Sequence, residues 1–208
     1  MHPKLLTFAI AAIVASAPAF AQQSQPSPSP QPATSSTNKE GSVPDRRNDQ
    51  QNRIANGVQS GQLSAGETKR LESREANVNS EIRNDRAANG GKLTAQERGQ
   101  VNRQQNNLSR SIYNDKHNAA QARYGNNAVG QRRANQQARI ANGIRNGSMT
   151  AGEAARSENR QQRINRQIGA DRAANGGRLT GQEHRQINRR QNGASRQIYR
   201  QKHNRARR

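Results

Sequence analysis

The apolar residues of this chain recur at the spacing of a helix face. Leu71, Val78 and Ile82 are separated by seven and then four positions, so they fall on one side of a single α-helix. No segment shows the period-two alternation of apolar and polar residues that a half-buried strand requires. Proline, which interrupts helices, does not occur after Pro44. The pattern therefore predicts an all-α fold with long helices.

The predicted helical region is a tandem duplication. Residues 46–118 align without gaps on residues 132–204 at an offset of 86, with 41 identical pairs among 73. The sequence RIANG begins at Arg53 and again at Arg139, and DRAANGG begins at Asp85 and again at Asp171. We therefore expect helical repeat 1 (46–118), a Gly/Asn-containing linker (119–131), an Arg-rich helical repeat 2 (132–204) and a basic tail (205–208).

Short motifs mark where the helices of each repeat begin and end. Four Ser/Thr-x-x-Glu capping boxes predict helix starts, because their side chains accept hydrogen bonds from otherwise unsatisfied backbone amides. These structural caps are Ser64 with Glu67, Thr94 with Glu97, Thr150 with Glu153, and Thr180 with Glu183. Asn-Gly pairs tolerate the left-handed conformation that ends helices, and they predict ends at Asn56-Gly57, Asn89-Gly90, Asn142-Gly143 and Asn175-Gly176. Each repeat should thus be a short helix and two long helices, in helix-loop-helix order.

The predicted core is small for a chain of this length. In repeat 1 it consists of Ile54, Val58, Leu63, Leu71, Val78, Ile82, Leu93, Val101, Leu108 and Ile112. Repeat 2 offers less apolar surface, because Ser157 and Ala194 stand where repeat 1 has Leu71 and Leu108. Few apolar residues and a high net charge limit the surface that folding can bury. We expect marginal stability, with the repeats stacking on each other or on a partner, self-association included.

The N-terminus carries the pattern of a secretory signal peptide. Lys4 precedes an apolar run over residues 5–17, and Ala19 and Ala21 supply the small residues of a cleavage site. Cleavage near Ala21 would place the protein in the periplasm or outside the cell, whereas a retained membrane anchor is the alternative. Residues 22–45, rich in Pro, Ser and Gln, are predicted to be a disordered tether. The chain has no cysteine, which excludes a lipoprotein and any disulfide.

Positive charge is concentrated in the second half of the chain. Residues 22–118 carry a net charge of +4 and residues 119–208 a net charge of +16, and 19 of the 20 basic residues in the latter are arginines. Such a field attracts phosphate-rich or carboxylate-rich polymers, although a solvated helix surface is the plain alternative. Arginines three, four or seven residues apart share helix flanks, and the predicted anion-binding residues are Arg156, Arg160, Arg163, Arg166, Arg185, Arg189, Arg196 and Arg200. In the envelope, lipopolysaccharide, anionic lipid and extracellular nucleic acid are the accessible partners.

No arrangement of residues indicates an enzyme, a catalytic residue or a small-molecule substrate. His117 and His203 fall at helix ends within Lys-His-Asn, where a cationic group suits the helix C-terminus, and His184 lacks a zinc-motif context. Tyr113 and Tyr199 each follow the last core isoleucine and are expected to pack at the helix ends. We therefore expect a non-enzymatic protein without a cofactor.

The loop at residues 56–67 resembles a degenerate EF-hand. Gly61, Leu63 and Glu67 occupy the places of the family's glycine, apolar residue and final glutamate. The resemblance makes the candidate calcium ligands Asn56, Ser60 and Glu67 in the first repeat, and Asn142, Asn146 and Glu153 in the second. Val58 and Ile144 stand where the family has an oxygen ligand, and each loop offers one carboxylate, whereas calcium prefers six to eight oxygens. This shortfall argues against calcium and leaves a calcium-responsive module as an alternative.

The composition and the repeat sequences each resemble those of known groups of proteins. The high Gln, Asn, Gly and Arg content resembles that of hydrophilin-like stress protectants, which is a second alternative function. The RIANG and GKLT-type repeats are similar to those of small uncharacterised exported proteins of Gram-negative bacteria, a likeness that implies export but no activity. The leading hypothesis is an exported envelope protein that binds anionic polymers through repeat 2.

Overall fold

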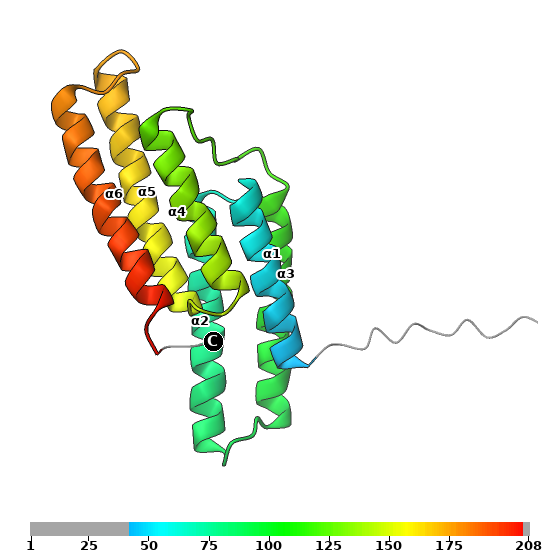
Figure 1. Ribbon diagram of the computed structural model, residues 1–208. Helices are drawn as coiled ribbons and strands as arrows, with labels where there is room; N and C mark the ends of the chain where they lie inside the picture. Colours follow the sequence, from blue (N-terminus) through cyan, green and yellow to red (C-terminus); the bar gives the residue numbers. More distant parts are fainter. Residues whose placement is uncertain (1–41, 206–208) are drawn as a thin grey trace, which may run out of the picture. The chain divides into compact units, whose positions relative to one another are not determined.

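The computed structural model describes residues 42–205, which form six α-helices and no strand (Figure 1). The helices are α1 (Val43–Ser60), α2 (Ala65–Ala88), α3 (Ala95–Lys116), α4 (Ala128–Arg145), α5 (Ala151–Ala174) and α6 (Gly181–Lys202). The all-α prediction is therefore confirmed. The predicted signal peptide, the tether up to residue 41 and the last three residues of the basic tail lie outside the described residues.

The predicted helix starts are present, and the first helix begins earlier than predicted. All four capping boxes form at the starts of α2, α3, α5 and α6. Ser42 and Asp45 make a fifth at α1, with Pro44 in the first turn, where a missing amide costs nothing. Residues 42–45 are thus the cap and first turn of repeat 1 rather than tether. Similarly, Asn127 caps α4 by accepting a hydrogen bond from the Gly130 amide, inside the predicted linker.

Two of the four predicted helix ends are wrong. Helices α2 and α5 end at Asn89 and Asn175 as expected, but α1 continues past Gly57 to Ser60 and α4 continues past Gly143 to Arg145. Gly57 and Gly143 are buried within these helices because the following loop folds back on them. A Cβ atom on Gly57 would lie 2.7 Å from the Leu63 side chain, and one on Gly143 would lie 2.6 Å from the Met149 sulfur. These glycines allow close packing rather than a left-handed turn.

The two helices of repeat 1 that contact repeat 2 each pack against the equivalent helix of repeat 2. Within a repeat, the third helix packs on the first and second; between repeats, α1 packs on α4 and α2 on α5. The α2–α3 and α5–α6 connections lie at opposite ends of the bundle, so the paired helices run in opposite directions (Figure 1). This is the self-complementary arrangement of a two-fold dimer, formed within one chain. The predicted stacking of the repeats on each other is confirmed.

The main hydrophobic core belongs to both repeats. Ile54, Leu71 and Ile112 share one buried cluster with Ile140 and Ile198 of the second repeat. Smaller clusters fill the ends of the two repeats, around Val78 to Val101 and around Ile164 to Ala194. All ten predicted core residues of repeat 1 are buried. The joint cluster means that neither repeat completes its core alone.

A single repeat, produced without the other, is therefore expected to be unstable. Separation would expose the shared faces of α1 and α2, or of α4 and α5, to water. Thermal unfolding followed by circular dichroism should show no cooperative transition above about 60 °C for a monomeric single repeat. A monomeric repeat that melts cooperatively above this temperature would contradict the dependence on the shared core.

Candidate anion-binding surface

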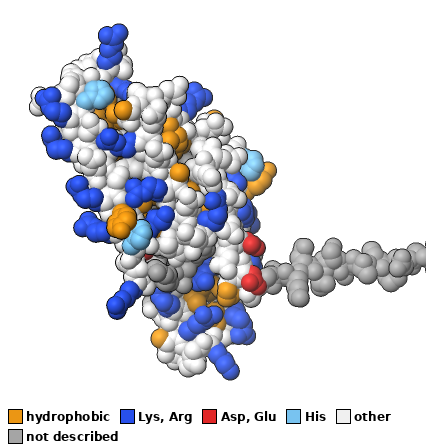
Figure 2. All heavy atoms as spheres, in the orientation of Figure 1, with side chains coloured by type: hydrophobic (Ala, Val, Ile, Leu, Met, Phe, Trp, Pro, Cys, Tyr) orange, Lys and Arg blue, Asp and Glu red, His pale blue; other side chains and the backbone are white. Residues whose placement is uncertain are grey.

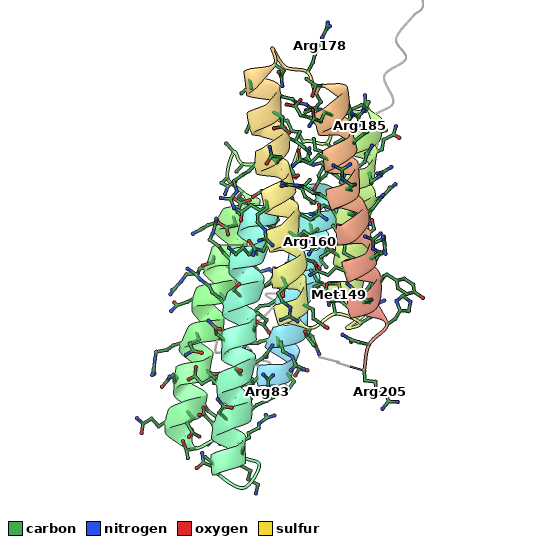
Figure 3. The ribbon with its side chains drawn as sticks, turned by 90° about the vertical axis from the view of Figure 1, so that its left-hand side faces the viewer. Arg83, Met149, Arg160, Arg178, Arg185 and Arg205 are labelled. Atoms are coloured by element: carbon green, nitrogen blue, oxygen red, sulfur yellow. The ribbon has the colours of Figure 1, made fainter. Side chains whose placement is uncertain are left out.

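The predicted arginines of α6 lie on one solvent-facing side of that helix. Arg185, Arg189, Arg196 and Arg200 are exposed, and by helix geometry they lie opposite the buried positions, such as Ile187, that pack toward the core. Figure 3 shows Arg185 on this helix and Arg160 on the neighbouring α5. Figure 2 shows many Lys and Arg side chains over the visible face. The few acidic side chains on this face lie mostly near the start of α1.

The predicted arginines of α5 separate into different surroundings. Arg160 and Arg163 line a groove of about 320 Å³ between α5 and α6, together with Ile164 and Arg190. Arg190 was absent from the predicted set, because it lies off the helical stripe that Arg185 and Arg189 begin. Its place in the groove depends on how α6 packs against α5, which no spacing within one helix reveals. Arg166 is exposed on α5, and Arg156 lies at a different hollow between the two repeats.

Repeat 1 has the same groove with different chemistry. A groove of about 360 Å³ between α2 and α3 is lined by Arg74, Asn77, Val78, Glu81, Gln104, Asn107 and Leu108. At the offset of 86, Asn77 corresponds to Arg163 and Gln104 to Arg190. Glu81 of the first groove accepts hydrogen bonds from the amides of Gln100 and Gln104 at 2.6 and 2.7 Å. The duplicated groove thus holds one carboxylate and one guanidinium group in repeat 1, and three guanidinium groups in repeat 2.

The conserved arginine of the two grooves also differs in its partners. Arg74 donates a 2.7 Å hydrogen bond to the Ser111 hydroxyl in the first groove. Within residues 42–205, Arg160, Arg163 and Arg190 make no hydrogen bond or ion pair. The Arg160 side chain extends from α5 to α6 near Gly193. A Cβ atom on Gly193 would lie 3.2 Å from Arg160 Nη1. Its hydrogen-bond donors therefore remain available to a ligand in the groove.

A second basic hollow, of about 380 Å³, lies where α4 meets α6. Arg139, Arg196 and Arg200 line it together with Ser195 and Tyr199. Its floor is fixed by a 3.3 Å hydrogen bond from Arg139 Nη2 to the Ser195 carbonyl. The hollow brings two predicted arginines of α6 together with one of α4 that was not predicted.

The two helix-end tyrosines are exposed, contrary to the expectation that they would pack. Tyr113 and Tyr199 have 59% and 57% of their surface accessible. Each ring instead stacks on the histidine one turn later, His117 or His203, with ring centroids 4.2 and 4.1 Å apart. The histidines are the C-caps of α3 and α6, as predicted. The last core contact of each helix is the preceding isoleucine, which leaves the tyrosine face in water.

The candidate calcium ligands are engaged in other interactions. The segment that resembles the calcium loop is helical through Ser60, which places Asn56 within α1. Arg145 donates to the Oδ1 atoms of both Asn56 and Asn142, at 3.0 and 3.2 Å. The carboxylate of Glu67 accepts from Ser64 and, at 2.7 Å, from Asn118 Nδ2, and Glu153 makes the equivalent contacts with Thr150 and Asn204. Within residues 42–205, no three acidic, histidine or cysteine side chains group as metal ligands.

Comparison of the chain with protein-family models, with curated proteins and with solved structures finds no match. The candidate surface is therefore interpreted from its own geometry.

Buried glutamates are a feature that the sequence pattern did not predict. Glu72 and Glu75 of α2 and Glu158 of α5 are almost completely inaccessible. Burial raises the pKa of Glu158 to about 8, and the hydrogen bond from Gln137 Nε2, 2.9 Å long, opposes the rise. A strongly shifted pKa often marks a functional group. Glu158 is fully buried, lines none of the grooves described above, and accepts its hydrogen bond from Gln137 of α4.

Stability is expected to depend on pH through Glu158. Its pKa lies above the ordinary 4.5 in the folded chain, so between pH 4.5 and about 8 the folded state holds a proton that the unfolded state has released. The stability present at low pH is therefore lost as the pH rises toward 8. Glu158→Gln should match the parent near pH 5 and melt at a higher temperature at pH 8. Glu97→Gln, at a partly accessible capping residue of α3, serves as control, and parallel pH profiles for Glu158→Gln and the parent would refute this assignment.

Proposed function

We propose that this protein is a non-enzymatic exported protein whose second repeat binds anionic polymers bearing phosphate groups. The observation that carries the proposal is the divergence of the duplicated groove. The α5–α6 groove has arginines at Arg163 and Arg190 where the α2–α3 groove has Asn77 and Gln104. The groove of repeat 1 serves as a reference for that of repeat 2, because the two grooves lie between equivalent helices.

The chemistry of the groove suits phosphate. The guanidinium group is planar, remains charged at neutral pH and donates two parallel hydrogen bonds to a phosphate or carboxylate. Three such groups without partners among residues 42–205 lie along one groove. Their mutual repulsion is relieved when an anion binds between them.

Several basic hollows on one repeat favour an extended ligand. Besides the α5–α6 groove and the α4–α6 hollow, a third hollow of about 330 Å³ at the α5–α6 connection is lined by Arg172, Arg178 and His184. Figure 3 shows Arg178 at this end of the bundle and Arg160 near its middle. A polymer with regularly spaced negative charges can occupy such separated sites at once, which increases affinity without new contacts.

Export is the part of the proposal that rests on sequence. The apolar segment and cleavage pattern of residues 1–21 support it and lie outside the described residues. Among residues 42–205, no helix has the length and apolar character needed to cross a membrane. In the envelope, lipopolysaccharide, anionic lipid headgroups and extracellular nucleic acid all present closely spaced phosphates.

The proposal is tested by making the second groove resemble the first. The double variant Arg163→Asn/Arg190→Gln restores the residues of repeat 1, and its affinity for inorganic polyphosphate should fall. Each lost phosphate contact should also reduce the slope of log affinity against log salt by about 0.7 to 0.9. Calorimetric titrations at several salt concentrations measure both quantities.

The matched control removes the same charge from repeat 1. Arg103 and Arg110 are exposed on α3 and correspond to Arg189 and Arg196. Arg103→Gln/Arg110→Gln should leave polyphosphate binding close to that of the parent. Equal losses in the two double variants would show that net charge alone governs binding, and would reject the groove as the site.

A further inference from the structure

A further hollow, larger than the α5–α6 groove, lies between the two repeats. It measures about 550 Å³ and is enclosed by α1 and α2 of repeat 1 and by the first turn of α5. Its walls carry three arginines, Arg47, Arg83 and Arg156, and its lining includes no Asp or Glu. None of the residues of the α5–α6 groove contributes to it. Its volume falls in the range of about 300–1,000 Å³ that is typical of small-molecule sites.

The arginines of this hollow have unused hydrogen-bond donors. The Nε atom of Arg47 is buried and has no hydrogen-bond partner among residues 42–205. Arg156 likewise makes no hydrogen bond or ion pair within this part of the chain, and Arg83 donates only to Ser80 Oγ, at 3.1 Å. The remaining guanidinium donors of Arg83 and Arg156 are therefore available to a bound oxyanion.

The neighbouring carboxylates are turned to other partners. Glu153, in the first turn of α5, is buried and accepts hydrogen bonds from Thr150 and Asn204. Glu72 accepts a 3.2 Å hydrogen bond from Gln51, and the Gln51 side chain stands between this carboxylate and the hollow as part of its lining. Glu75 of α2 is buried and accepts a 3.3 Å hydrogen bond from Asn79 Nδ2. The charged side chains that line the hollow itself are therefore all positive.

The symmetry-related position is closed. At the offset of 86, Ala76 corresponds to Gln162, whose Nε2 lies 2.8 Å from the point where a Cβ atom on Gly66 would be. On the open side the equivalent distance, from the point where a Cβ atom on Gly152 would be to the Ala76 Cβ atom, is 4.0 Å. The Gln162 side chain thus fills the space beside the first turn of α2. The smaller Ala76 leaves the equivalent space beside the first turn of α5 open.

The charges also differ between the two sides. Arg83 corresponds to Gly169, which carries no side chain, and Arg156 corresponds to Arg70, which pairs with Asp115 at 3.7 Å. Arg47 corresponds to Arg133, whose guanidinium lies over the Tyr124 ring at 5.3 Å. The open side therefore has Arg83 and Arg156 without an ion pair, where the closed side has Gly169 and the paired Arg70.

We propose that this hollow is a binding site for a small phosphate monoester, held by Arg47, Arg83 and Arg156. The arginines approach from α1, α2 and α5, so their donors can surround one phosphate group from three directions. The polar side chains of Asn77, Asn79 and Ser80 line the remainder of the hollow and suit the hydroxyls of a sugar. The site goes beyond polymer binding, because it would select a compact ligand between the repeats.

Calorimetric titration of the mature chain in physiological salt tests the proposal. The probes are inorganic phosphate and glucose 6-phosphate. Ala76→Gln places the residue of the closed side in the open one without changing the charge, and it should abolish binding of both probes. Arg156→Gln should weaken binding about tenfold or more, since a charged hydrogen bond is lost. Arg103→Gln removes the same charge from the exposed face of α3, away from every predicted anion-binding residue, and should leave the Kd unchanged.

The outcomes separate this site from the polymer-binding groove. Arg163→Asn/Arg190→Gln should bind glucose 6-phosphate like the parent, even if it no longer binds polyphosphate. Tighter binding of glucose 6-phosphate than of phosphate would place a sugar in the hollow, and equal binding would limit the site to the phosphate group. The proposal is overturned if the parent shows no binding at millimolar concentrations, if a folded Ala76→Gln variant binds normally, or if Arg156→Gln and Arg103→Gln weaken binding equally. If Ala76→Gln does not fold, the comparison of the two Arg→Gln variants tests the proposal alone.

Discussion

The packing of each helix against its own duplicate is the constraint on which the rest of the structure depends. A chain with so few apolar residues has little surface to bury, and the main cluster is complete only when Ile54 and Leu71 meet Ile140 and Ile198. Buried glutamines extend this interior: Gln50 and Gln136 donate to the carbonyls of Gln105 and Gln191 at 2.6 and 2.7 Å. These hydrogen bonds give the glutamine amide nitrogens partners inside the bundle.

This constraint explains which positions have diverged between the repeats. The caps, the paired glycines and the core isoleucines support the common scaffold, and they are retained in both copies. The grooves between the second and third helices open to solvent, so Arg163 and Arg190 could replace Asn77 and Gln104 without disturbing the shared core. Arg163 and Arg190 therefore add positive charge on a surface that lies outside the shared core.

The sequence predicted the features that depend on local chemistry. Capping boxes, the core face of each helix and the duplicated unit follow from spacing within about one turn or from direct alignment. The predicted end at Gly57 was wrong because this glycine accommodates Leu63, a contact made only after the loop folds back. The same limit applies to the candidate sites: Arg190 joins Arg160, and Arg47 faces Arg156, through packing between helices. Buried Glu158 gave no sequence signal, because glutamate is ordinarily exposed.

The divergence of the two grooves is the central claim, and a single spectroscopic titration tests it most directly. The Nε–Hε resonances of the arginines can be followed by NMR while polyphosphate is added to the intact protein. Arg160 and Arg74 form a matched pair at equivalent positions of the two grooves. If polyphosphate binds in the α5–α6 groove, the resonances of Arg160, Arg163 and Arg190 shift early in the titration and that of Arg74 does not. Shifts of equal size at Arg74 and Arg160 would contradict it.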